Sequence, residues 1–119
     1  MKADSFNKVL PYRIQIPDDM LREENVPLLI FLHGAGERGS DNQKQLMHSP
    51  LSIAPSGTFK KHQCIFVAPQ CPEEAWWSGE YLELVIGLIH ELTRQFPVDR
   101  KRIFITGLSM GGMGTWSLL

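Results

Sequence analysis

The stretch that decides the fold is RIFITGLSMGGMGTWSLL, residues 102–119. Its first part, RIFITG (102–107), is an apolar run typical of a buried strand, and the segment after Ser109 is compatible with a helix. Between the expected strand and the expected helix lies Ser109, with a glycine two positions away on each side. The stretch therefore predicts a strand, a tight turn at the serine and a helix.

The residues of the turn, GLSMG (107–111), match the pattern G-x-S-x-G of a nucleophile elbow, in which a serine links a strand to a helix. A turn this tight strains the backbone of Ser109, and side chains at Gly107 or Gly111 would collide with it. The hydroxyl would then stand at the helix N-terminus, where free N–H groups favour negative charge. The alternative is a glycine-rich turn that only lets the helix approach the sheet, as Gly112 and Gly114 would allow.

Three more segments upstream predict strands. VLPYRIQIP (9–17) alternates partly and is bounded by prolines, as in an outer strand. VPLLIFLHG (26–34) and CIFVAPQ (64–70) are continuous apolar runs like 102–107, and such runs indicate strands buried on both faces of a parallel sheet. Residues 35–63 read as a loop with one short helix near 41–48.

The segment 78–96 predicts a helix between the last two strands. Its apolar stripe repeats at helical spacing, Ser78 can cap its start, and Pro97 ends it. Strand, helix and strand then form a right-handed crossover. The stripe consists of Tyr81, Val85, Leu88 and Leu92.

Composition describes one ordinary globular domain over residues 1–119, with 43% hydrophobic residues and a net charge of -1. The charge gives no reason to expect nucleic acid or an anionic membrane as partner. No apolar run approaches the ~20 residues that span a bilayer. The N-terminus lacks the apolar core of a signal peptide, which favours the cytoplasm and leaves the compartment open. Cys64 and Cys71 would lie ~23 Å apart on an extended strand, too far for a disulfide.

A second glycine-rich segment, LHGAGERG (32–39), follows the strand at 26–34. An acyl-transfer enzyme needs two N–H donors for the oxyanion of its tetrahedral intermediate. We expect one from Met110 and the other from Ala35, or from Gly36 if the loop is shifted by one residue. His33 and Gly34 would support this loop, with His33 hydrogen-bonded inside it. The spacing fits neither a dinucleotide-binding loop nor a P-loop.

Four side chains near these loops complete the candidate site. Trp76 and Trp77 follow a strand end, where ligand sites of parallel sheets lie, so they are candidates to line a substrate pocket. The alternative is that at least one of them fills the core. Glu37 and Arg38 are expected either to pair and brace the oxyanion loop or to be solvated separately.

The chain resembles the α/β-hydrolase superfamily, in particular bacterial esterases of the dienelactone-hydrolase-like and phospholipase/carboxylesterase types. The resemblance rests on FLHGAGERG (31–39), VAPQCPEEAWW (67–77) and PVDRKRIFITGLSMGGMGTW (97–116), in this order. It implies a mostly parallel sheet with helices on both faces. It also implies ester hydrolysis through an acyl-enzyme on Ser109, with no metal or organic cofactor and a small-molecule ester as substrate.

The catalytic serine of this fold is followed by an acid and then by a histidine. No acid and no histidine follow Ser109, and His48, His62 and His90 have no context as catalytic bases. We therefore expect the N-terminal half of a hydrolase domain, truncated after the nucleophile elbow and inactive alone. Its strand 102–107 would become an edge open to self-association. The alternatives are a prolyl-oligopeptidase-type serine peptidase and a non-catalytic fragment or binding module.

Overall fold

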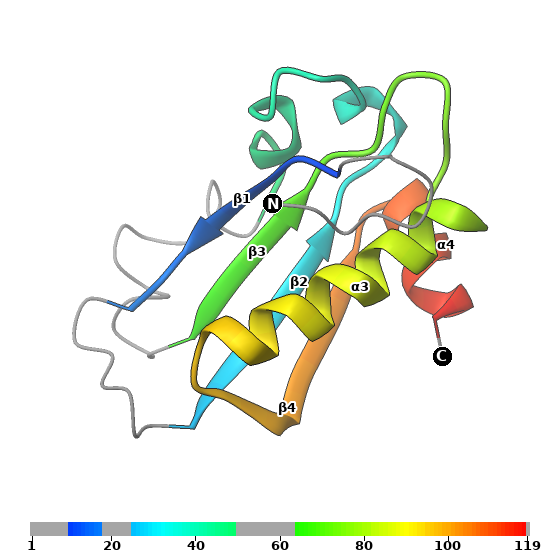
Figure 1. The fold of residues 1–119 in the computed structure, drawn as a ribbon. Helices are drawn as coiled ribbons and strands as arrows, with labels where there is room; N and C mark the ends of the chain where they lie inside the picture. The colour runs from blue at the N-terminus through cyan, green and yellow to red at the C-terminus, as the bar shows by residue number, and fades with distance from the viewer. Residues whose placement is uncertain (1–9, 18–24, 50–63, 119) are drawn as a thin grey trace.

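The computed structural model describes residues 10–17, 25–49 and 64–118. Position 9 of the first expected strand and residues 50–63 of the expected loop, which include His62, lie outside this part of the chain. Four strands form one sheet in the order β1-β3-β2-β4 (Figure 1). The strands are β1 (Tyr12–Gln15), β2 (Val26–Leu32), β3 (Ile65–Pro69) and β4 (Val98–Gly107).

The sheet is mixed but mostly parallel, as expected from its continuous apolar runs. β2 pairs in parallel with both β3 and β4, whereas β1 runs antiparallel to β3 at one edge. The prediction of an outer strand near the N-terminus is therefore confirmed. β4 lies at the opposite edge of the sheet and is longer than expected, because Val98 and the polar residues 99–101 extend it.

Helix α3 (Glu80–Gln95) lies across one face of the sheet between β3 and β4. In Figure 1 the chain passes from β3 through α3, in front of the sheet, to β4 on the right, which is the expected right-handed crossover. The helix ends before Pro97, as expected. Its predicted stripe faces the sheet: Val85, Leu88 and Leu92 are buried and Tyr81 is half-buried.

The start of α3 differs from the expectation. The helix begins at Glu80, and the residue before its first turn is Gly79, at φ 53°. Ser78 lies one position too early, and the helix has no side-chain cap. Glycine is chosen here because the chain enters the helix through a left-handed conformation. The predicted capping role of Ser78 is therefore wrong.

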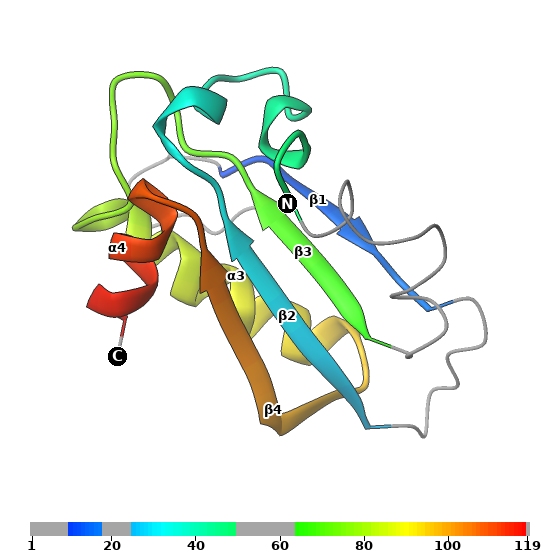
Figure 2. The same cartoon turned by 180° about the vertical axis from the view of Figure 1, so that it is seen from behind.

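The two faces of the sheet carry different layers. Alternate residues of β2, among them Leu28, Ile30 and Leu32, pack in the main core with α3, and Met110 of helix α4 (Met110–Ser117) joins them. The opposite face holds a smaller cluster around Phe31 and Phe66, which the short helix η2 (Lys44–Leu46) partly covers (Figure 2). The helix expected near 41–48 is thus a single 3-10 turn.

Burial on both faces holds for β2 and β3 but not for β4. Every residue of β3 is buried, whereas β4 alternates. Ile103 and Ile105 pack on the main core, and Phe104, in register with Leu29, leaves 53% of its surface exposed on the other face. An apolar run alone could not separate a strand buried on both faces from a strand whose outer face is open.

Candidate active site

Ser109 occupies the turn between β4 and α4 in a strained conformation. Its φ is 56° and its ψ is -113°. A residue with a side chain in such a region of backbone space costs ~1–3 kcal/mol and needs surrounding structure to hold it. Asn42 is the one other residue in the described part of the chain that has positive φ without being glycine.

Two glycines of the turn lie where no side chain fits. A Cβ at Gly111 would stand 1.7 Å from the carbonyl oxygen of Leu32, and a Cβ at Gly107 would stand 2.1 Å from the carbonyl oxygen of Gly111. Both neighbours are backbone atoms, so they cannot move aside as a flexible side chain would. Gly114 packs against Trp77, whereas Gly112 has only ordinary contacts. Gly107 therefore avoids a clash within the turn, as expected, whereas Gly111 avoids a clash with the neighbouring strand β2, which the sequence pattern did not indicate.

The Ser109 hydroxyl is not used to close the helix. Serine before a first helical turn usually accepts a hydrogen bond from a backbone N–H, but Ser109 makes no such bond. Its carbonyl accepts from Met113 N–H at 3.1 Å, which starts the helical ladder. The residue is exposed. The side chain is thus free to meet a second molecule.

The loop after β2 lies against this turn. A Cβ at Gly34 would stand 3.6 Å from Ser109 Cβ and 3.4 Å from the carbonyl oxygen of Leu108. The short helix η1 (Ala35–Glu37) begins there, at the same end of the sheet as the serine turn, because Leu32 at the end of β2 is in register with Gly107 at the end of β4. Within the described ranges, the N–H groups of Ala35, Gly36 and Met110 have no recorded acceptor.

Glu37 and Arg38 hold the loop separately. The Glu37 carboxylate accepts Gly34 N–H at 3.1 Å. Arg38 donates to the carbonyl oxygens of Ala35 at 2.9 Å and Ala75 at 3.1 Å. No ion pair joins the two side chains, which are both described, so the expected pairing is wrong although both residues brace the loop.

His33 is buried at the centre of this edge and has no free nitrogen. Its Nε2 accepts Cys71 N–H at 2.8 Å, so Nδ1 carries the proton and donates to the carbonyl oxygen of Gly34 at 2.6 Å. Burial lowers the pKa of His33, against the opposing effect of the Gly34 hydrogen bond. The neutral ring ties its own loop to the loop after β3. It cannot also serve Ser109 as a base.

The two tryptophans have different environments. Trp77 is 3% exposed, its indole N–H donates to the carbonyl oxygen of His33 at 3.0 Å, and its ring lies 5.1 Å from the His33 ring. It belongs to the core, so it is unavailable as a pocket residue. Trp76 is 51% exposed, with the Arg38 guanidinium 5.4 Å from its ring. The alternative expectation, that one tryptophan fills the core, is confirmed.

Gln70 is a buried residue whose side chain makes several hydrogen bonds, and the sequence analysis did not identify it. Its side chain accepts Asn42 N–H at 2.7 Å and donates to Glu37 O at 3.1 Å and Asp41 Oδ1 at 2.9 Å. The Gln70 hydrogen bond, with the N–H groups of Gln43 and Lys44, lowers the pKa of Asp41 to about 2. The available signal was a polar residue at the end of the apolar run CIFVAPQ.

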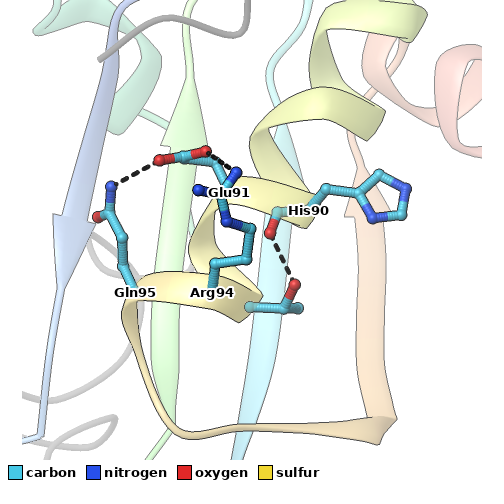
Figure 3. Close-up of polar contacts among 5 residues, drawn as sticks. His90, Glu91, Arg94 and Gln95 are labelled. Carbon is cyan, nitrogen blue, oxygen red and sulfur yellow. Dashed lines mark hydrogen bonds and ion pairs between the residues drawn. The ribbon is translucent and has the colours of Figure 1, made fainter.

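The remaining histidines and the two cysteines have no role in the candidate site around Ser109. His48 is exposed, and His90 lies on the outer side of α3, where its carbonyl accepts the Thr93 hydroxyl and its ring contacts none of the residues drawn (Figure 3). Cys64 and Cys71 are free thiols, as expected, and burial raises the pKa of Cys71 to about 12. In residues 10–17, 25–49 and 64–118, no cluster of three metal-binding side chains occurs, and no helix is long and apolar enough to cross a bilayer.

Among the solved structures that this chain resembles are two esterases. No protein-family model matches the chain, and no curated protein does. The crystal structure of a thermostable esterase is 39% identical, with a TM-score of 0.82 over 92% of this chain and 33% of that chain. A thermophilic esterase from the planctomycete Thermogutta terrifontis, solved with propionate bound, is 18% identical, with a TM-score of 0.66 over 92% and 40%. The second likeness concerns the fold alone. The chain spans about a third of the first esterase's length.

Proposed function

We propose that this chain, which has the fold of an esterase-type α/β-hydrolase over the part that it spans, supplies the nucleophile of a carboxylic-ester hydrolase. The nucleophile is Ser109. The observation that carries the proposal is the serine turn itself: a strained, exposed serine that leaves its hydroxyl free at the start of a helix. Strain of this kind persists in proteins mainly where function uses it.

The reaction follows from the groups around the serine. Ser109 Oγ attacks the ester carbonyl, and the carbonyl oxygen becomes an oxyanion held by the N–H groups of Met110 and Ala35, with Gly36 as the alternative donor. The alcohol leaves, and water then releases the acid from the acyl-enzyme. The free N–H groups on both loops support this role.

The proton of Ser109 requires a base, and no histidine in residues 10–17, 25–49 and 64–118 is placed to supply one. His33 has both ring nitrogens in hydrogen bonds, and His48 and His90 are exposed elsewhere. We propose that a histidine, oriented by an acid, comes from other parts of the full protein, as the order of the triad in this fold requires. No step of this mechanism needs a metal or an organic cofactor.

Trp76 is the candidate for contact with the substrate. Its exposed ring belongs to the loop after β3, and Ser109 follows β4; both strands run parallel to β2, so their carboxyl ends lie at the same end of the sheet. An aromatic face of this kind suits the apolar acyl or alcohol part of a small ester. The alternative of a prolyl peptidase is tested by assaying prolyl amides beside the esters.

The test is a serine replacement with a matched control. In the full-length protein, Ser109→Ala is expected to abolish p-nitrophenyl ester hydrolysis without changing the circular dichroism spectrum. Ser117→Ala removes an exposed serine at the end of α4 and should leave turnover unchanged. Undiminished turnover in Ser109→Ala would exclude Ser109 as the nucleophile.

We also propose that β4 pairs with a second copy of this chain when these 119 residues stand alone. One side of the strand is bonded to β2, and in the described sheet its other side has no partner strand. Such an edge is a ready template for another strand.

A further inference from the structure

Arg38 joins the two loops that border Ser109. Its Nε donates to the carbonyl oxygen of Ala35 at 2.9 Å, and its Nη1 donates to the carbonyl oxygen of Ala75 at 3.1 Å, across 37 residues of sequence. The guanidinium also lies 5.4 Å from the ring of Trp76. The side chain is half-buried. One residue therefore holds the loop after β2 and the loop after β3 at a fixed separation.

The bond to Ala35 fixes more than a carbonyl. A trans peptide is planar, so the carbonyl of one residue and the N–H of the next point in opposite directions. No peptide bond in the described chain is cis. The Ala35 carbonyl accepts both Arg38 Nε and Arg38 backbone N–H, at 2.9 and 3.3 Å. Holding this oxygen therefore aims Gly36 N–H to the opposite side.

The preceding peptide is held in the same manner. The Gly34 carbonyl accepts His33 Nδ1–H at 2.6 Å and Glu37 N–H at 3.3 Å, which aims Ala35 N–H. Two consecutive peptide planes beside the serine are thus fixed at their carbonyl oxygens by the side chains of His33 and Arg38. The N–H groups of Ala35 and Gly36 donate to no acceptor among the described residues. This is what is expected of donors that bind a ligand.

We infer that Arg38 is a positioning residue for the oxyanion donors at Ala35 and Gly36. The inference rests on the proposed function. Arg38 does not touch the reacting atoms in this arrangement. It keeps the donors ready for the oxyanion, so its contribution belongs to the transition state and not to the binding of the ester.

Lysine cannot reproduce these contacts. A guanidinium is a planar fork that places two N–H groups on different acceptors while its flat face stacks on an aromatic ring. A lysine ammonium is a single charged point and would reach one carbonyl or the other. Arg38→Lys therefore keeps the charge and loses the link between the loops, which separates positioning from a simple electrostatic effect.

The experiment compares Arg38→Lys and Arg38→Gln with Arg94→Gln in the full-length protein. Arg94 is a suitable control because it lies on the outer side of α3, paired with Glu91 at 3.3 Å (Figure 3). For a small p-nitrophenyl ester we expect both Arg38 variants to lower kcat ~10-fold or more with KM changed less than ~3-fold, since loss of a whole oxyanion donor costs ~100–1,000-fold. Arg94→Gln should match the unsubstituted protein.

Added guanidinium ion separates positioning from general loosening of the fold. At millimolar concentration it should restore part of the kcat of Arg38→Gln by filling the vacated place, and it should leave Arg94→Gln unaffected. Unchanged kcat in both Arg38 variants would overturn the inference, as would a loss that tracks a fall in Tm and is not rescued. Failure of the proposed function gives a different result, because the unsubstituted protein would then show no Ser109-dependent hydrolysis.

Discussion

Ser109 combines two properties that rarely occur together in a serine at a helix start. It has a positive φ, and it does not cap the helix that follows. A serine chosen for stability would accept a backbone N–H and adopt an ordinary extended conformation. Ser109 therefore lowers the stability of the fold. This cost is explained if its hydroxyl acts as a nucleophile.

A glycine at this position should relieve the strain. Glycine reaches φ 56° without a Cβ penalty, so Ser109→Gly is expected to be ~1–3 kcal/mol more stable than Ser109→Ala, while both lack hydrolysis. Urea denaturation of the two variants measures the difference. Equal stabilities would mean that the turn is not strained.

His33 should make stability depend on pH. Its pKa is lowered by burial from the ordinary value of 6.5, so in the window just below pH 6.5 the unfolded chain binds more protons than the folded one. Stability then rises with pH through this window and is lost as the pH falls. We expect Tm to decrease from pH 7 to pH 5.5, and the difference between His33 and a His33→Gln variant to shrink. A constant difference would contradict the buried, neutral ring.

At the scale of elements, the first turn of α4 is fitted directly onto the end of β2. Gly111→Ala should therefore be severely destabilising, by several kcal/mol (about 4 or more), because its Cβ would overlap the Leu32 carbonyl. Gly112→Ala is the matched control, since its Cβ meets nothing closer than 3.6 Å, and its effect should stay within ~1 kcal/mol. Chemical denaturation of both variants tests the contact. Similar stability of the two would refute it.

The elements themselves were largely readable from sequence. Continuous apolar runs located β2 and β3, the helical stripe located α3, and the glycine pattern located the serine turn. Errors arose where the outcome depended on partners far along the chain. The burial of Trp77 depends on His33 and Gly114, and the hydrogen bonds of Gln70 depend on a loop nearly thirty residues earlier. The error at Ser78 was local, because the adjacent Gly79 precedes the first turn of α3 in its place.

The site was partly readable for the same reason. Ser109 and Gly111 could be identified from one short motif, because the turn that they form is local. The sequence suggested that Arg38 braces its loop, but its partners could not be predicted, since the second acceptor, Ala75, is 37 residues away and is a backbone carbonyl that no side-chain pattern marks.

At the scale of the molecule, these 119 residues alone should show little or no ester turnover. A serine without an adjacent base is a weak nucleophile, and none of the described histidines is placed to act as one. The purified chain and its Ser109→Ala version should hydrolyse p-nitrophenyl acetate equally slowly. Multiple turnover that depends on Ser109 would show that a base comes from within the chain.

The same chain should associate through β4. Phe104 lies on the open face of this strand at 53% exposure, and Ile86 lies on α3 at 43%. A concentration-dependent shift to a larger species on a sizing column is expected for the unsubstituted chain. Phe104→Lys should reduce that shift and Ile86→Lys should not. A monomer at all concentrations would count against the proposal.

The contact between Gly111 and Leu32 has a consequence for protein engineering. The five-residue signature around Ser109 suggests a unit that could be moved to another protein. Its last glycine, however, is required by contact with a strand about eighty positions earlier. Transplanting the turn into another scaffold would fail unless the neighbouring parallel strand came with it at the same register. The smallest transferable unit is therefore a pair of strands with their two following loops, and sequence searches for the signature alone will also find serines that lack this second half.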